Sequence, residues 1–174
     1  MITLQEARRI VLENAVLLQP ERIDFTQSLH RVLAEDLFCD ADIPAFTRSA
    51  VDGYACKRED INTELEIIEI IPAGKVPENI INSGQCSKIM TGGMLPDGAD
   101  CVIMVEDTEE VGNDRIRFTG QDTETNIRYK AEEVKAGECI LKKGKFIRPQ
   151  EIAAMAVAGY TFQLVIRKVR VGVI

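Results

Sequence analysis

Apolar residues near the amino terminus recur at helical spacing and predict an amphipathic helix. The apolar positions fall on one face within Leu4–Val11. Thr3 and Glu6 stand three residues apart, as the two members of a capping box do, so we expect Thr3 to cap the helix. The helix is expected to end between Asn14 and Pro20.

The next pattern is a short alternation over Arg22–Phe25, which predicts a strand, followed by Ser28–Leu33, which predicts one or two helical turns. From Lys57 to Arg128 the pattern changes to short β-branched runs separated by Gly, Pro, Asn and Asp. The predicted strands are Leu65–Ile71, Lys88–Thr91, Cys101–Val105 and Arg115–Phe118.

This middle region is expected to be a small all-β module. The run Val111–Arg115 contains Gly-Asn-Asp and predicts a reversal, so we expect hairpins to make most of the connections. A barrel or a curled sheet would protect the edge strands.

The carboxyl-terminal part predicts a hairpin over Gly137–Gly144 and then a helix. Pro149 suits the first position of that helix and Gly159 suits a left-handed cap at its end. Arg167–Ile174 begins a strand of the kind that opens a buried parallel sheet, and no partner strand follows it, so the chain is expected to be truncated.

These patterns together predict the α+β class, with a discontinuous helical or mixed domain and a small all-β, barrel-like domain inserted in it. Residues 1–46 with 132–167 are expected to form the discontinuous domain, and residues 47–131 the inserted β domain. Residues 168–174 are expected to open a third domain.

The stretch Asp42–Ala55 is the first with candidate chemistry. Pro44 favours an extended entry. Ser49, Asp52 and Gly53 predict a tight turn that presents the Asp52 carboxylate on a rigid backbone. The same spacing is also typical of an ordinary Asp-Gly turn between two strands.

A second stretch, Ile89–Val102 followed by Glu106, contains Thr91-Gly92-Gly93 and Pro96-Asp97-Gly98-Ala99-Asp100. Together with Pro44, Phe46, Ser49-Ala50 and Asp52–Ala55, it resembles the MoeA/gephyrin E-domain family of molybdopterin molybdenumtransferases. The resemblance runs over essentially the whole chain. It implies that the chain holds the first two domains of that family, that residues 168–174 open its pterin-binding domain, and that the discontinuous domain makes a homodimer.

Composition and charge limit the kinds of partner and location that the chain is expected to have. The 174 residues are 45% hydrophobic and 28% charged, and the formal charge of -7 with a pI near 4.9 argues against a nucleic-acid partner. No apolar run is long enough to span a bilayer and the basic start of a signal peptide is missing, so we expect a cytoplasmic protein without a membrane partner.

The five cysteines are scattered and His30 is the only histidine, which makes a zinc site improbable. We expect reduced, mostly buried thiols. His30 is expected at the surface without a chemical role, at a position where the family commonly has Gly.

The resemblance implies insertion of molybdate into adenylylated molybdopterin with release of AMP, assisted by Mg²⁺. It implies catalytic roles for Asp52 and Thr91, and a magnesium site that includes Asp52 and Glu133. Backbone amides at the glycines beside Thr91 are expected to form an anion-binding nest. The residues expected to contact the bound pterin nucleotide are Ser49, Gly53, Gly92 and Gly93.

Two departures from the family pattern stand out. The usual Gly-Glu-Asp is Ala131-Glu132-Glu133 here, which keeps the acid with one more methylene, and the usual Asn before Ser49 is Arg48. Three hypotheses remain: the amino-terminal part of an enzyme that is inactive by itself, a dimerisation and scaffold module of the same family, and a generic structural β-domain.

Overall fold

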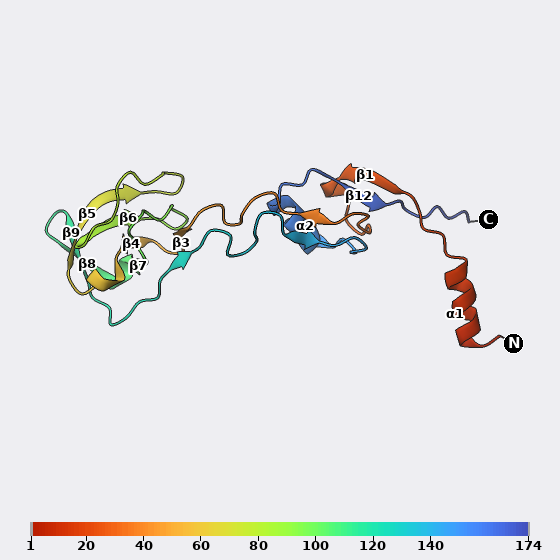
Figure 1. The fold of residues 1–174 in the computed structure, drawn as a ribbon, viewed down its shortest axis with the longest axis horizontal. Helices are drawn as coiled ribbons and strands as arrows, with labels where there is room; N and C mark the ends of the chain where they lie inside the picture. Colours follow the sequence, from red (N-terminus) through yellow and green to blue (C-terminus); the bar gives the residue numbers. More distant parts are fainter. Residues whose placement is uncertain (1, 174) are drawn as a thin grey trace. The chain divides into compact units, whose positions relative to one another are not determined.

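The computed structural model describes residues 2–173 and divides the chain into two compact units. The first unit is Met1–Asp40 with Gly137–Ile174, and the second is Ala41–Ala136. The fold is a mixed one with few helices, and its largest element is a curled β-sheet in the second unit (Figure 1). Within the described residues, no helix has both the length and the apolar character needed to cross a membrane.

The first unit holds both α-helices and two small sheets. Its elements are α1 (Leu4–Glu13), β1 (Pro20–Asp24), the 3₁₀ turn η1 (Phe25–Gln27), β2 (Leu37–Phe38), β11 (Cys139–Leu141), α2 (Pro149–Val157) and β12 (Phe162–Ile166). Strand β1 pairs antiparallel with β12, and β2 pairs antiparallel with β11. Their shared core is Leu33, Leu37, Leu141, Ile147, Met155 and Val165.

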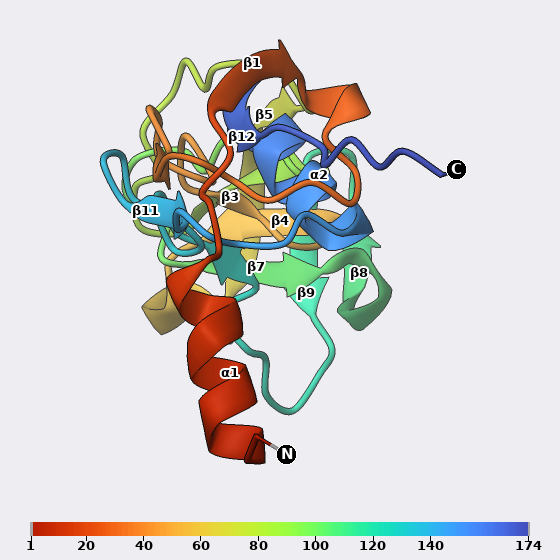
Figure 2. The same ribbon diagram turned by 90° about the vertical axis from the view of Figure 1, so that its right-hand side faces the viewer.

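Both helices begin where the sequence predicts. The Thr3 hydroxyl accepts a hydrogen bond from the Glu6 amide at 3.2 Å and caps α1. Figure 2 shows α1 as the helix at the N-terminal end of the chain. Pro149 is the first residue of α2, and Gly159 follows that helix with a φ of +77°. The two helices differ in burial, because α2 buries Met155 whereas α1 has no buried residue.

Two sequence predictions for the first unit are wrong. Ser28–Leu33 is not helical, since Val32 and Leu33 make isolated bridges to Phe146 and Val165. Within Gly137–Gly144, β11 pairs with β2 and not with a hairpin partner of its own.

Residues 168–173 form no strand, and Ile174 lies outside the described residues. That residues 168–174 open a third domain stays a prediction. A strand needs a neighbour for its backbone groups, and no strand of the described chain pairs with this segment. Its valines are accordingly exposed, with Val171 at 78%.

The second unit is built on a six-stranded sheet in the order β7-β4-β6-β5-β9-β8. The elements are β3 (Arg48–Ser49), β4 (Gly53–Cys56), η2 (Arg58–Asp60), β5 (Glu64–Ile71), β6 (Gln85–Ile89), β7 (Cys101–Met104), η3 (Val105–Asp107), β8 (Thr108–Val111), β9 (Arg115–Phe118) and β10 (Ile127–Arg128). Strand β3 pairs with β10 in a separate two-stranded sheet.

Apolar clusters cover both faces of the six-stranded sheet. Tyr54 and Cys56 of β4 belong to one cluster, and Ala55 between them belongs to the other. This is the alternation expected of a strand that is buried on both sides. The sheet therefore carries the core of the second unit.

The predicted strands match β5, β7 and β9 closely, whereas Lys88–Thr91 overlaps β6 only at Lys88 and Ile89. The expected connections agree less well. The reversal at Val111–Arg115 does join the antiparallel neighbours β8 and β9. Strands β5 and β6, however, are parallel neighbours, and β4 separates β6 from β7. Hairpins therefore do not make most of the connections.

Candidate functional site

The predicted turn after Pro44 forms, and Ser49 is the residue that shapes it. Ile43 enters through an isolated antiparallel bridge to Val134. The buried Ser49 hydroxyl donates to the Val51 carbonyl at 2.6 Å and accepts from the Val51 amide at 3.2 Å. Because both bonds stay within the turn, the Ser49 hydroxyl orders the backbone that leads to Asp52.

Asp52 and Thr91, which are far apart in the sequence, are in direct contact. The Asp52 Oδ1 atom accepts from the Thr91 amide at 2.6 Å and from the Thr91 hydroxyl at 2.7 Å. These bonds, the one from the amide first, hold the pKa of the exposed Asp52 carboxyl below its ordinary value. Asp52 is therefore a fixed carboxylate whose second oxygen makes no hydrogen bond within the described residues.

Two glycines beside this pair are explained by packing. A Cβ on Gly53 would lie 2.0 Å from the Ile103 carbonyl oxygen, so glycine lets β4 approach β7 closely. A Cβ on Gly93 would lie 2.9 Å from both the Ile89 side chain and the Met90 carbonyl oxygen. Contact with a pterin nucleotide remains a prediction for both residues.

Gly92 has a different reason to be glycine. Its φ is +79°, in the left-handed region, and no heavy atom stands within 4 Å of the Cβ position. The turn that presents Thr91 thus depends on Gly92 for its backbone conformation, and the space beside Gly92 is open.

The expected nest of backbone amides is not formed. The Thr91 amide is bound to Asp52, the Gly92 amide donates to the Ser49 carbonyl at 2.9 Å, and the Gly93 amide donates to the Met90 carbonyl at 2.8 Å. Each amide is committed to the protein, so an anion here would need other donors.

Two arginines supply such donors. A cavity of about 280 Å³ is lined by Arg48, Ser49, Ala50, Thr91, Gly92 and Arg128. It therefore contains three predicted site residues, Ser49, Thr91 and Gly92. The sequence marked Arg48 only as a departure from the family pattern and did not single out Arg128; no local signal shows that β3 and β10 pair.

Glu133 lies elsewhere in the same unit. Its amide donates to the Ile43 carbonyl at 3.0 Å, and its side chain makes no hydrogen bond or ion pair in the described structure. No contact joins it to Asp52, and residues 2–173 contain no group of three or more His, Cys, Asp and Glu side chains suited to hold a metal. Asp52 and Glu133 are thus not joined in one carboxylate cluster among the described residues, and magnesium binding by this pair stays a prediction.

No disulfide joins the five cysteines in the described part of the chain, and most of them are buried, as the sequence predicts. Cys39, Cys56, Cys86 and Cys101 are buried and Cys139 is partly so. Cys86, Cys56 and Cys101 lie opposite one another on three neighbouring strands. Burial raises the pKa of Cys86 to about 12, which makes that thiol a poor nucleophile.

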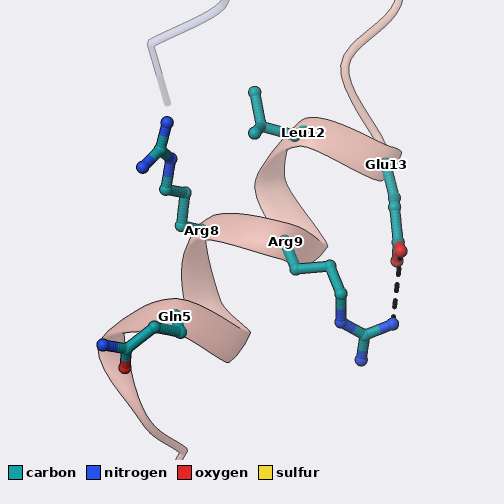
Figure 3. A pocket seen from close by; sticks show the side chains of 5 residues that line it. All are labelled: Gln5, Arg8, Arg9, Leu12 and Glu13. Atoms are coloured by element: carbon teal, nitrogen blue, oxygen red, sulfur yellow. Dashed lines mark hydrogen bonds and ion pairs between the residues drawn. The ribbon is translucent and has the colours of Figure 1, made fainter.

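A larger hollow, about 470 Å³, runs along α1 and is lined by Gln5, Arg8, Arg9, Leu12 and Glu13 (Figure 3). All five residues belong to one exposed helix, and Arg9 is paired with Glu13 at 3.2 Å. This surface lacks a second wall, so the cavity beside Asp52 and Thr91 is the better candidate site.

Comparison with known proteins identifies the family. The family described as the MoeA N-terminal region (domain I and II) matches residues 2–159. The chain belongs to the MoeA family. The region matched is the one that the resemblance implied from Asp52–Ala55 and Ile89–Val102.

Relatives and solved structures agree with this assignment. The molybdopterin molybdenumtransferase of Staphylococcus epidermidis is 39% identical over 99% of this chain and 43% of its own length. That of Staphylococcus aureus is 33% identical over the same shares. The molybdopterin biosynthesis MoeA protein from Pyrococcus horikoshii OT3 has a TM-score of 0.85 and 34% identity, over 95% of this chain and 46% of that structure. This chain thus spans less than half the length of these MoeA proteins.

Proposed function

We propose that this chain is the amino-terminal part of a molybdopterin molybdenumtransferase, which inserts molybdate into adenylylated molybdopterin and releases AMP. Membership of the MoeA family and the names of its relatives support the reaction class. The observation that carries the proposal is the Asp52–Thr91 pair, a fixed carboxylate and hydroxyl at the edge of an open cavity.

Asp52 would act as a preorganised charge. Its Oδ1 atom is held by Thr91, so the orientation of the carboxylate is set before a substrate arrives and its other oxygen stays available. Fixed charges and dipoles of this kind contribute most when charge develops in a transition state. Thr91 orients Asp52, and its hydroxyl oxygen can still accept a hydrogen bond while it donates to Asp52.

Magnesium is the assisting ion that the resemblance implies, with Asp52 and Glu133 as ligands. Hard cations prefer several oxygen ligands, and the described residues offer one open carboxylate in the cavity region and a separate one at Glu133. Magnesium binding by this pair therefore remains a prediction.

The test is the molybdenum-insertion rate of a complete molybdenumtransferase that carries residues 1–174 in place of its own amino-terminal region, for example that of Staphylococcus epidermidis. Asp52→Asn should lower cofactor formation and AMP release by roughly 10² or more, the loss expected when a preorganised charge is removed. Thr91→Val should lower them less, because it removes a neutral hydroxyl.

Asp114→Asn is the matched control, since Asp114 lies in the exposed β8–β9 turn, away from the cavity. It should leave the rate unchanged. Residues 1–174 alone are expected neither to bind the adenylylated pterin tightly nor to turn it over. An unchanged rate in Asp52→Asn, or turnover by residues 1–174 alone, would contradict the proposal.

A second candidate function is homodimerisation through the first unit, and α1 is the observation that favours it. Leu4, Val11 and Leu12 are 81%, 68% and 62% exposed on an amphipathic helix. Exposed apolar stripes of this kind are suited to a second copy of the chain. Sedimentation at tens of micromolar would test this, and a single species of 19.4 kDa would count against it.

A further inference from the structure

Arg48 and Arg128 lie directly opposite each other in the antiparallel β3–β10 pair. Residues opposite each other in such a pair project from the same face of the sheet, with their Cβ atoms roughly 5 Å apart. Like charges in this arrangement repel, so a bound anion between the two guanidinium groups would be favourable. Both side chains line the cavity of about 280 Å³.

Among the hydrogen-bond donors that line this cavity, the two arginines make the fewest bonds to the protein itself. Arg48 makes no side-chain hydrogen bond or ion pair among residues 2–173, and Arg128 pairs only with Glu132, at 3.2 Å, in an exposed contact. Exposed ion pairs of this kind are weak and yield readily to a better partner.

The other polar groups of the cavity wall are occupied. The Ala50 amide donates to the Asn126 carbonyl, the Gly92 amide to Ser49, and the Thr91 hydroxyl to Asp52. Recognition of an anion would therefore rest on the guanidinium groups, whose planar fork binds two oxygens of a tetrahedral oxyanion at once.

We propose that Arg48 and Arg128 form a binding site for a doubly charged tetrahedral oxyanion, the class that includes phosphate, nucleotide phosphate groups and molybdate. Arg48 distinguishes this site from the usual pattern of the family, which has Asn at this position. The claim that the site binds an oxyanion of the molybdenum-insertion reaction rests on the proposed function. The claim that the two arginines bind an anion does not.

Calorimetric titration of the 174-residue chain at low ionic strength tests the site, with sodium molybdate, inorganic phosphate and AMP as separate ligands. Arg48→Asn and Arg128→Gln should each weaken binding about tenfold or more, the usual loss for a charge-assisted hydrogen bond. Arg48→Lys, which keeps the charge without the fork, should bind between wild type and Arg48→Asn.

Arg115→Gln is the matched control, because Arg115 is an exposed arginine of β9 in the same unit and does not line the cavity. It should bind as wild type does. Equal weakening by Arg115→Gln and Arg48→Asn would show a non-specific effect of net charge and overturn the site. Failure of the wild type to bind any of the three anions at millimolar concentration would overturn it too.

The three ligands also distinguish the source of the oxyanion. Tighter binding of molybdate than of phosphate would assign the site to molybdate, and tighter binding of AMP than of phosphate would assign it to a nucleotide. Anion binding that is unchanged by Arg115→Gln and lost in Arg48→Asn would stand even if Asp52→Asn retained full molybdenum insertion. The failures of the two proposals are therefore separable.

Discussion

The six-stranded sheet of the second unit and helix α1 of the first unit differ in how far they bury their apolar side chains. In the second unit, the six-stranded sheet is covered on both faces, and Tyr54, Leu65 and Ile103 are 1% exposed or less. In the first unit, the core includes Met155 of α2 and Val165 of β12, whereas α1 carries an apolar stripe but has no buried residue. An apolar pattern therefore predicts a surface suited to burial. Only the tertiary structure decides whether other residues of the same unit cover that surface.

Gly53→Ala tests how tightly the second unit is packed and should have the largest effect. The added Cβ would lie 2.0 Å from the Ile103 carbonyl oxygen, which is backbone and can move only with its strand. We expect a loss of about 3 kcal/mol in the free energy of unfolding, measured by chemical denaturation. Gly172→Ala, where nothing lies within 4 Å, is the control, and a loss no greater than in this control would show that β4 and β7 are loosely packed.

Glu69 tests whether the second unit also depends on a buried charge. The carboxylate, 8% exposed, bonds to Lys75 at 2.8 Å and accepts from the amides of Glu78 and Asn79. Burial opposes its ionisation, but the bonds from Lys75 and the two amides outweigh burial and hold the pKa of Glu69 below its ordinary value of 4.5. Glu69→Gln should cost about 2 kcal/mol at pH 7.

The pH dependence sharpens this test. Because the folded-state pKa of Glu69 is lowered, its stabilisation is fully present above pH 4.5 and is lost as the pH falls through the folded value. The stability difference between wild type and Glu69→Gln should therefore shrink below pH 4.5. Glu66→Gln, on the exposed side of the same strand, is the control and should show no such pH-dependent difference. If the stability difference between wild type and Glu69→Gln persists below pH 4.5, packing and not charge explains it.

Each unit has a non-glycine residue with a left-handed backbone, and substituting it by glycine measures the strain that this conformation causes. Ala131 has a φ of +60° and His30 a φ of +62°, and both stand where the resembling family pattern has Gly. Ala131→Gly should stabilise the second unit by about 0.5 kcal/mol, because the relief of Cβ strain exceeds the added chain entropy. His30→Gly should gain less, since it also loses the stacking of His30 on Phe146. Thermal unfolding would measure both, and destabilisation by Ala131→Gly would contradict the argument.

Leu12→Ser in α1 should have the smallest effect on the isolated chain. Leu12 is 62% exposed, and surface substitutions usually change stability by less than about 0.5 kcal/mol. If a second copy covers α1, the same substitution should weaken dimerisation in sedimentation experiments and leave the unfolding of dilute protein unchanged. Val157→Ser, at 67% exposure on α2, is the control.

The sequence anticipated the candidate site unevenly. Two short motifs predict Asp52, Thr91, Ser49 and Gly92 as site residues, and the structure brings Asp52 against Thr91. The amide nest was wrong because the same amides are needed to hold the turns together. Arg128 was missed because its relation to Arg48 exists only when residues eighty positions apart pair as strands.

Features that depend only on neighbouring residues could be predicted from the sequence. Side-chain and backbone preferences over a few positions account for four such features. They are the cap at Thr3, the start of α2 at Pro149, the left-handed residue Gly159 after α2, and the reversal before Arg115. Only the three-dimensional structure shows that β5 pairs parallel with β6, that β11 pairs with β2, and that residues 168–173 form no strand. Strand pairing satisfies backbone groups between distant segments, so it depends on which segments meet and not on the propensity of either one.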